Sequence, residues 1–187
     1  MNMPAVPKHQ CDRFFFAVQP DADAARGIHL FTVRELPEGR PVPLTHQHVT
    51  LALTEDAEPP ADALAERLRE VGAQVRGDPF DLVFDRLSAS RRSVALVPDN
   101  APAALFALQR SIADAMARRS VPMRLGWRFR PHQTLCHRKG EPFSRAVQEF
   151  RYAVREFLLI RSVVGMTRHE VVDRWPLKAD SGIMDAA

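Results

Sequence analysis

The sequence predicts an α+β fold with antiparallel β-structure rather than a doubly wound parallel sheet. Strand-like and helix-like segments are mixed along the chain, and at least one connection is a hairpin. In that hairpin, the strand-like runs 80–87 and 93–97 are separated by a polar Ser-Ala-Ser-Arg-Arg turn of the kind that joins antiparallel neighbours. This combination favours an α+β sandwich.

The first half of the chain contains two predicted strands and two predicted helices. The apolar run 13–19 (RFFFAVQ) is typical of a buried strand, and 48–54 is the second strand. A helix is expected over 21–36, with an aspartate at its start. Pro59-Pro60 opens another helix, which Gly72 is expected to end.

The second half opens with the hairpin and continues into a helix over 101–119, with Asn100 as its expected cap. Apolar residues repeat there at three- and four-residue steps, which is the spacing of one helix face. The remaining predicted elements are a strand at 132–137, a shorter helix near 142–150, a long strand near 153–163 and a last strand near 168–175.

The length of 187 residues predicts one compact unit. We expect residues 12–178 to form this single domain, with flexible tails at 1–11 and 179–187. Hydrophobic residues make up 45% of the chain, which is enough to bury a core.

Charge, cysteines and hydropathy exclude several classes of protein. The net charge of +3 and the pI of about 9.3 suit an anionic ligand. Cys11 and Cys136 form no CxxC pair, so the sequence predicts neither a disulfide framework nor a zinc knuckle. No apolar run approaches the roughly 20 residues of a membrane helix, and the start lacks the hydrophobic segment of an export signal. We therefore expect a cytoplasmic monomer without membrane contact.

Two short motifs carry the chemistry, and they stand nearly half the chain apart. They read His48-Val49-Thr50-Leu51 and His132-Gln133-Thr134-Leu135. Side chains alternate along a strand, so the histidine and threonine of each motif share one face. Each motif also precedes a predicted Pro-led helix, which suggests a faint internal repeat in which two lobes each contribute one strand to a shared cleft.

Two imidazoles and two hydroxyls around one cavity fit phosphoester chemistry without a metal. Hydrolysis of a 2′,3′-cyclic phosphate needs one group to take a proton from water and another to protonate the departing ribose oxygen. Histidine performs both roles near neutral pH. Threonine hydroxyls can donate hydrogen bonds to the non-bridging phosphate oxygens. The residues alone do not decide which histidine is the acid.

These features resemble the two-histidine (2H) phosphoesterase superfamily, and within it the bacterial RNA 2′,3′-cyclic phosphodiesterases, also called 2′-5′ RNA ligases. The likeness covers nearly the whole folded part. Its supporting segments are Arg13-Phe14-Phe15-Phe16-Ala17-Val18, Leu36-Pro37 with Val42-Pro43, Pro131 before the second motif, Phe157-Leu158-Leu159-Ile160-Arg161-Ser162, Gly165, and Trp175-Pro176-Leu177.

The resemblance implies a bilobal fold of two antiparallel sheets, with a central cleft, helices outside and a pseudo-two-fold repeat. It implies that His48 is the proton donor, His132 the proton acceptor, and that Thr50 and Thr134 hold the phosphate. The implied substrates are RNA ends or small cyclic nucleotides, hydrolysed to 2′-phosphomonoesters with reversible 2′-5′ ligation, and no cofactor or metal is implied. Two positions depart from the family pattern. That pattern leads us to expect arginine at position 137 and tyrosine at position 169, whereas this sequence has His137 and His169.

The stretch 118–139 is basic and contains no acidic residue. It can form an RNA-backbone groove, with Arg128, Arg130, His137 and Arg138 as the candidate RNA-binding residues, or it can be a solvated basic loop. Two aromatic residues in it, Trp127 and Phe129, can stack on bases or pack in the protein.

Other functions remain as alternatives. One is a zinc site, to which His46, His48, His132 and His137 would contribute imidazoles, although no cysteine or HExxH helix accompanies them. Another is a non-catalytic RNA-binding module, which would gain little from two histidines aimed at one cleft. A third is a 2H phosphodiesterase for another nucleotide, such as 2′-5′ oligoadenylate or cyclic ADP-ribose phosphate.

Overall fold

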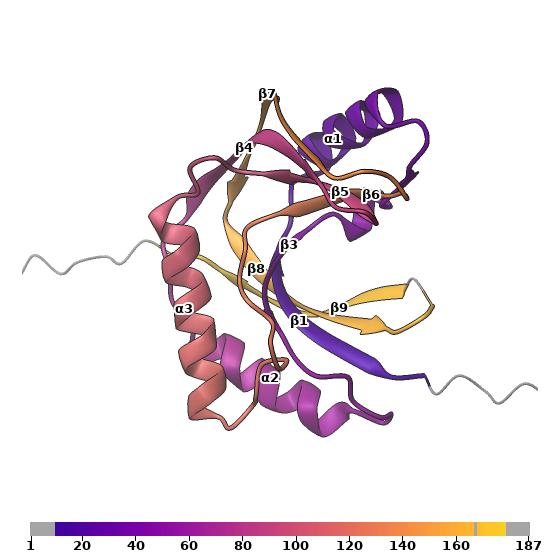
Figure 1. Cartoon of the computed structure of the whole chain (residues 1–187). Coiled ribbons are helices and arrows are strands. Elements are labelled where there is room, and N and C mark those ends of the chain that lie inside the picture. The colour runs from indigo at the N-terminus through magenta and orange to yellow at the C-terminus, as the bar shows by residue number, and fades with distance from the viewer. Residues whose placement is uncertain (1–9, 167, 179–187) are drawn as a thin grey trace, which may run out of the picture.

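The computed structural model describes residues 10–166 and 168–178, which form two antiparallel sheets with three helices packed around them (Figure 1). The four-stranded sheet has the order β3 (Val49–Leu53), β1 (Asp12–Val18), β8 (Glu156–Val163), β9 (Arg168–Pro176). The five-stranded sheet has the order β2 (Arg40–Pro41), β6 (Gln133–His137), β5 (Ser93–Val97), β4 (Phe80–Ala89), β7 (Phe143–Val154). The predicted α+β class with two antiparallel sheets is confirmed.

The helices connect the two halves of the molecule. Helix α1 (Ala22–Glu35) follows β1 but packs against β6 and β7 of the other sheet. Helix α2 (Asp62–Gln74) packs against β8 and β9, while α3 (Ala103–Arg118), which joins β5 to β6, packs against α2 and β3. Helices α1 and α3 thus each follow a strand of one sheet and pack against the other sheet. The sheets themselves approach each other at β3 and β6.

The side chains of strand β1 lie on both faces of the four-stranded sheet, and only one of these faces packs into the main core. Phe14 and Phe16 belong to the main core, where Phe16 packs near Phe157 and Trp175. Phe15 points the other way and joins a small second cluster with Ala17, Leu158 and Ile160. The period of two along a strand therefore leaves one aromatic ring on the face opposite the main core.

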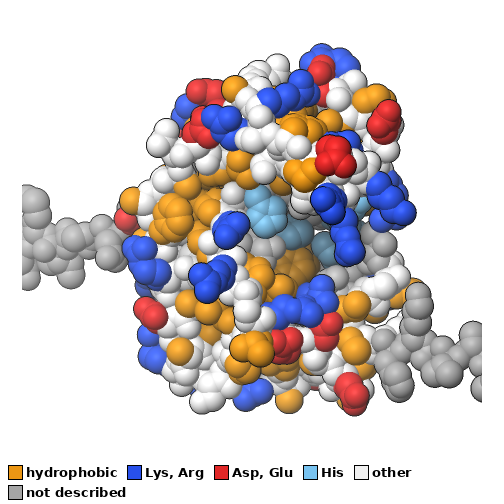
Figure 2. All heavy atoms as spheres, viewed as in Figure 1, with side chains coloured by type: hydrophobic (Ala, Val, Ile, Leu, Met, Phe, Trp, Pro, Cys, Tyr) orange, Lys and Arg blue, Asp and Glu red, His pale blue; other side chains and the backbone are white. Residues whose placement is uncertain are grey.

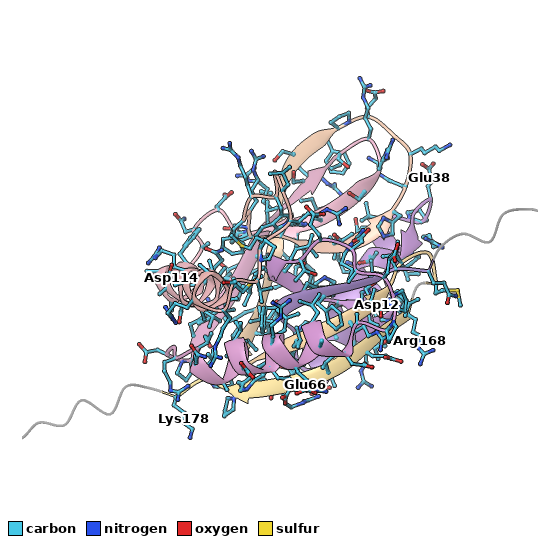
Figure 3. The ribbon with its side chains drawn as sticks, turned by 90° about the horizontal axis from the view of Figure 1, so that it is seen from below. Asp12, Glu38, Glu66, Asp114, Arg168 and Lys178 are labelled. Carbon is cyan, nitrogen blue, oxygen red and sulfur yellow. The ribbon has the colours of Figure 1, made fainter. Side chains whose placement is uncertain are left out.

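Charged side chains lie at the margins of this architecture. In Figure 3, Glu38, Glu66, Asp114 and Lys178 lie around the periphery of the view. Asp12 is an exception, since it is 1% exposed at the start of β1 and accepts a hydrogen bond from Arg161 at 2.5 Å. A buried carboxylate requires such a charged partner.

The helix predicted near 142–150 is wrong, because that segment forms the long strand β7. Its buried residues Phe150, Tyr152 and Val154 recur every second position, and the strand pairs with β4 along nearly its whole length. Long-range pairing therefore overrides the local helical pattern. The second histidine motif is accordingly not followed by a helix, so this part of the predicted repeat is also wrong.

Two predicted helix ends also differ. Gly72 lies inside α2, where the indole ring of Trp175 fills the space that a Cβ atom would need, and the helix continues to Gln74. Asn100 does not cap α3, which starts at Ala103 after Pro102 without a side-chain cap. The predicted tails fall largely on residues 1–9 and 179–187, outside the described residues.

Candidate active site

The two motif histidines immediately precede the strands at which the sheets meet. His48 stands before β3 and His132 before β6, and these strands contact each other. The predicted alternation agrees with the observed burial. Thr50 and Thr134 are only partly buried, whereas the intervening residues, Val49, Leu51, Gln133 and Leu135, are at most 2% exposed.

Both imidazole rings are held in the same way. Nδ1 of His48 lies 2.7 Å from the backbone oxygen of His46, and Nδ1 of His132 lies 2.7 Å from that of Arg130. A carbonyl oxygen only accepts hydrogen bonds, so each Nδ1 must carry the proton and donate it. Each Nε2 is therefore the ring nitrogen available for proton transfer.

A pocket of about 290 Å³ opens beside His48. Figure 2 shows histidine side chains gathered in a hollow on this face, with lysine and arginine side chains on more than one side of it. Among the residues that the structure describes, no carboxylate lines the pocket, which suits an anionic ligand. Its lining consists of Arg40, Pro41, Val42, Pro43, His46, His48, Thr134, His137 and His169.

Two aromatic rings pack against His48, and burial lowers its basicity. Its ring lies 4.8 Å from that of Phe15 and 5.7 Å from that of His169, which in turn stacks on His46 at 4.2 Å. Burial lowers the pKa of His48 to about 4, and positive charge on His132 and on His46 lowers it as well. Burial also lowers the pKa of His169 to about 4. In the free protein His48 is thus neutral at pH 7.

A chain of buried hydrogen bonds connects the two motifs from behind. Nε2 of Gln133 donates to Oε1 of Gln47 at 3.1 Å, and Nε2 of Gln47 donates to the backbone oxygen of Ala25 at 3.0 Å. The Tyr152 hydroxyl donates to Oε1 of Gln133 at 3.1 Å. Gln47 precedes His48 and Gln133 follows His132, and both are at most 3% exposed. This Gln47–Gln133 bridge therefore links the backbones that carry the two histidines.

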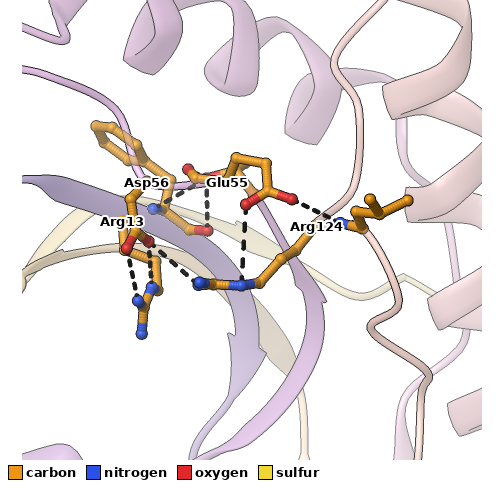
Figure 4. A network of polar contacts seen from close by, with 7 residues as sticks. Arg13, Glu55, Asp56 and Arg124 are labelled. Carbon is orange, nitrogen blue, oxygen red and sulfur yellow. Dashed lines mark hydrogen bonds and ion pairs between the residues drawn. The ribbon is translucent and has the colours of Figure 1, made fainter.

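The loop that leads into His132 is fastened to the end of β3 (Figure 4). The backbone N–H of Arg124 donates to the oxygen of Leu53, and the Arg124 side chain pairs with Asp56 at 3.1 Å. Arg13 also binds Asp56, at 2.6 and 2.8 Å, and holds the pKa of that carboxyl below its usual range. The loop is thereby tied to the sheet that carries His48.

The basic stretch 118–139 is divided between structural and solvent-facing positions. Arg119 pairs with Glu70, and Arg124 pairs with Asp56. Arg128 and Arg130 are exposed. Of the other two candidate RNA-binding residues, His137 lines the pocket, while Arg138 lies over the ring of Phe143 and donates to the backbone oxygen of Glu141.

The two aromatic residues of the stretch pack within the protein. Phe129 lies 5.7 Å from Phe106 and 6.4 Å from Trp127, measured between ring centroids. Both Phe129 and Trp127 are half-buried. They therefore contribute to the protein's own packing.

Sequence reasoning did not place Arg40, His46 and His169 in one pocket, nor did it find the Gln47–Gln133 bridge. A signal for the bridge existed, because alternation places Gln133 on a buried face, where its amide requires a partner. Among the described residues, no three histidine, cysteine or acidic side chains gather as a metal-binding cluster. No helix within the described part of the chain is long and apolar enough to span a membrane.

The sequence profile of the 2′-5′ RNA ligase superfamily matches residues 17–169, which include both motifs. The chain belongs to this superfamily. Its resemblance to the 2H phosphoesterases is thus confirmed, and the chain is a 2H phosphoesterase by family and fold. No curated protein matches the chain in sequence.

Several solved structures share the fold of this chain. Escherichia coli LigT complexed with 3′-AMP is 27% identical, with a TM-score of 0.72 over 90% of this chain and 99% of LigT. LigT in its apo form gives 25% identity and a TM-score of 0.74 over 91% and 99%. The protein TT0787 of Thermus thermophilus, at 20% identity and a TM-score of 0.68 over 90% and 99%, supports the fold alone.

Proposed function

We propose that this chain is an RNA 2′,3′-cyclic phosphodiesterase that hydrolyses cyclic ends to 2′-phosphomonoesters by two-histidine acid/base catalysis. The observation that carries the proposal is the matched restraint of His48 and His132. Each Nδ1 is bound by a carbonyl two residues earlier, so each Nε2 remains available for the reaction. Membership of the superfamily supports the same chemistry.

In the proposed reaction, Nε2 of His132 accepts a proton from the attacking water, whose oxygen forms a bond to phosphorus. The bond from phosphorus to the 3′ oxygen breaks, and His48 protonates that oxygen as it leaves. Thr50 and Thr134 donate hydrogen bonds to the non-bridging oxygens, where negative charge gathers. When a 5′-hydroxyl takes the place of water, its oxygen bonds to phosphorus, the bond to the 3′ oxygen breaks, and the two ends are joined by a 2′-5′ bond in a reversible step.

The product identifies the bond that breaks. We expect a nucleoside 2′,3′-cyclic phosphate to be converted to the 2′-phosphate, and phosphorus NMR distinguishes this from the 3′-phosphate. A dominant 3′-phosphate would contradict the proposed leaving group. If the protein turns over neither cyclic nucleotides, nor cyclic-ended RNA, nor 2′-5′ oligoadenylate, the alternative of a non-catalytic RNA-binding module is favoured.

Binding of the phosphate must prepare His48 for its role as acid. Burial lowers the pKa of His48 to about 4 in the free protein, so a neutral solution leaves it without the proton it must donate. A phosphate anion beside the ring favours the charged form and moves the pKa upward. We expect NMR titration of the imidazole to show this rise on addition of a nucleoside 2′-phosphate. An unchanged pKa in the complex would reverse the assigned order of acid and base.

A further inference from the structure

Exposed positive charge gathers at one end of the five-stranded sheet, beyond the catalytic pocket. We call this group, Arg40, Arg91, Arg92 and Lys139, the basic tip. Its members come from β2, from the turn between β4 and β5, and from the segment after β6. All four side chains are exposed, and within the described part of the chain none of them takes part in an ion pair.

The basic tip is continuous with the pocket. Arg40 lines the pocket and is paired across the sheet with His137, which lines it too. His137 pairs on its other side with Ser93, the residue after Arg92. Lys139 follows His137 by two residues, which is at most roughly 7 Å of extended chain. A ligand that extends from the pocket past His137 therefore lies next to the basic tip.

Backbone hydrogen bonds hold the outer part of the basic tip together. The N–H of Arg138 donates to the oxygen of Arg92 at 3.0 Å, and that of Gly140 donates to the oxygen of Arg91 at 3.4 Å. A shallow hollow of about 470 Å³ lies between these segments, and Glu141 is the one acidic residue in its lining of Arg91, Arg92, Lys139, Gly140 and Glu141. Three cationic side chains thus converge on one concave surface.

We propose that the basic tip binds the phosphodiester backbone of a single-stranded RNA whose cyclic end occupies the histidine pocket. The inference rests on the proposed function for the position of that end. Unpaired guanidinium and ammonium groups attract phosphates without regard to base sequence. The preferred substrate is consequently an oligonucleotide, because a mononucleotide leaves the tip empty.

Binding to a non-hydrolysable RNA tests the tip directly. The probe is a fluorescent RNA octamer that ends in a 2′-phosphate, titrated by anisotropy at several salt concentrations. Loss of two phosphate contacts in the double variant Arg91→Ala/Arg92→Ala should reduce the slope of log affinity against log salt by about 1.4. The matched control Arg67→Ala/Arg110→Ala, which removes the same charge from exposed positions on α2 and α3, should keep the wild-type slope. An unchanged slope in the tip variant overturns the inference.

A second comparison tests the direction in which the strand leaves. Arg128 and Arg130 precede β6, whereas Lys139 follows it, so the two basic groups flank opposite ends of that strand. If Arg128→Ala/Arg130→Ala lowers the salt slope and the tip variant does not, the RNA leaves by the other end and the inference is wrong.

Kinetics separate this inference from the proposed function. The tip variant should hydrolyse a mononucleoside 2′,3′-cyclic phosphate like the wild type, while its kcat/KM on a cyclic-ended octamer should fall about tenfold or more through KM. If the tip variant changes the kinetics on both substrates equally, or on neither, the inference is wrong, but the proposed phosphodiesterase activity is not contradicted. If the wild type shows no turnover but binds RNA in a way that depends on the basic tip, the proposed phosphodiesterase activity is wrong and the proposed RNA binding by the tip stands.

Discussion

Replacing His48 or His132 with alanine should lower kcat on a 2′,3′-cyclic phosphate by roughly 10²-fold to 10⁴-fold, the usual range for loss of one general acid or base. His48→Ala removes the donor to the leaving 3′ oxygen, and His132→Ala removes the acceptor for the water proton. Steady-state kinetics at saturating substrate measures both effects. Circular dichroism must first show that each variant is folded.

A histidine outside both motifs and outside the pocket provides the control for these variants. His29 lies on α1 and is half-buried, as His48 is, so His29→Ala removes an imidazole without touching the pocket. Its kcat should stay within about twofold of the wild type. If His29→Ala lowers kcat as much as His132→Ala does, loss of any imidazole impairs the protein, and the acid and base roles proposed for His48 and His132 are contradicted.

Replacing Gln133 with leucine should impair both stability and catalysis. The substitution leaves two buried groups without their partner, namely Oε1 of Gln47 and the hydroxyl of Tyr152. Each unpaired buried group costs about 1–3 kcal/mol in the free energy of unfolding. The bridge also fixes how the two histidine motifs approach, and a misplacement of about 1 Å can cost up to roughly 10²-fold in rate. We therefore expect kcat to fall about tenfold to a hundredfold with KM little changed.

Urea denaturation and steady-state kinetics distinguish the two effects of Gln133→Leu. The triple variant Gln47→Leu/Gln133→Leu/Tyr152→Phe removes the polar groups together, so it should recover much of the lost stability. If kcat recovers in parallel, the bridge serves stability alone. If the triple variant is stable yet slow, the bridge positions the histidines. An unchanged kcat in stable Gln133→Leu protein would refute a positioning role.

The features that the sequence predicted well depend on local patterns. Strand periodicity is sufficient to place Thr50 and Thr134 on one face and Val49 and Leu135 on the other, and the structure agrees. The histidine motifs are recognisable for the same reason, since each lies within four consecutive residues. The apolar spacing of α3 likewise predicted a helix within two residues of its observed ends.

The features that the sequence did not predict depend on contacts between distant segments. Residues 143–154 form a strand because β4 pairs with them, and no local signal announces that partner. Arg40 reaches the pocket through the two-residue strand β2, which exists only because it pairs with β6. Gln47 and Gln133 stand 86 residues apart, so their bond appears only when the sheets meet.

The double variant His48→Ala/His132→Ala tests the central claim most directly, that the two histidines act as one catalytic unit. Its kcat on a 2′,3′-cyclic phosphate is compared with those of the two single variants under identical conditions. Residues that act together are not additive, so the double variant should be little slower than the slower single variant. Near-full turnover in either single variant, or a double loss equal to the product of the single losses, would contradict paired-histidine catalysis in this protein.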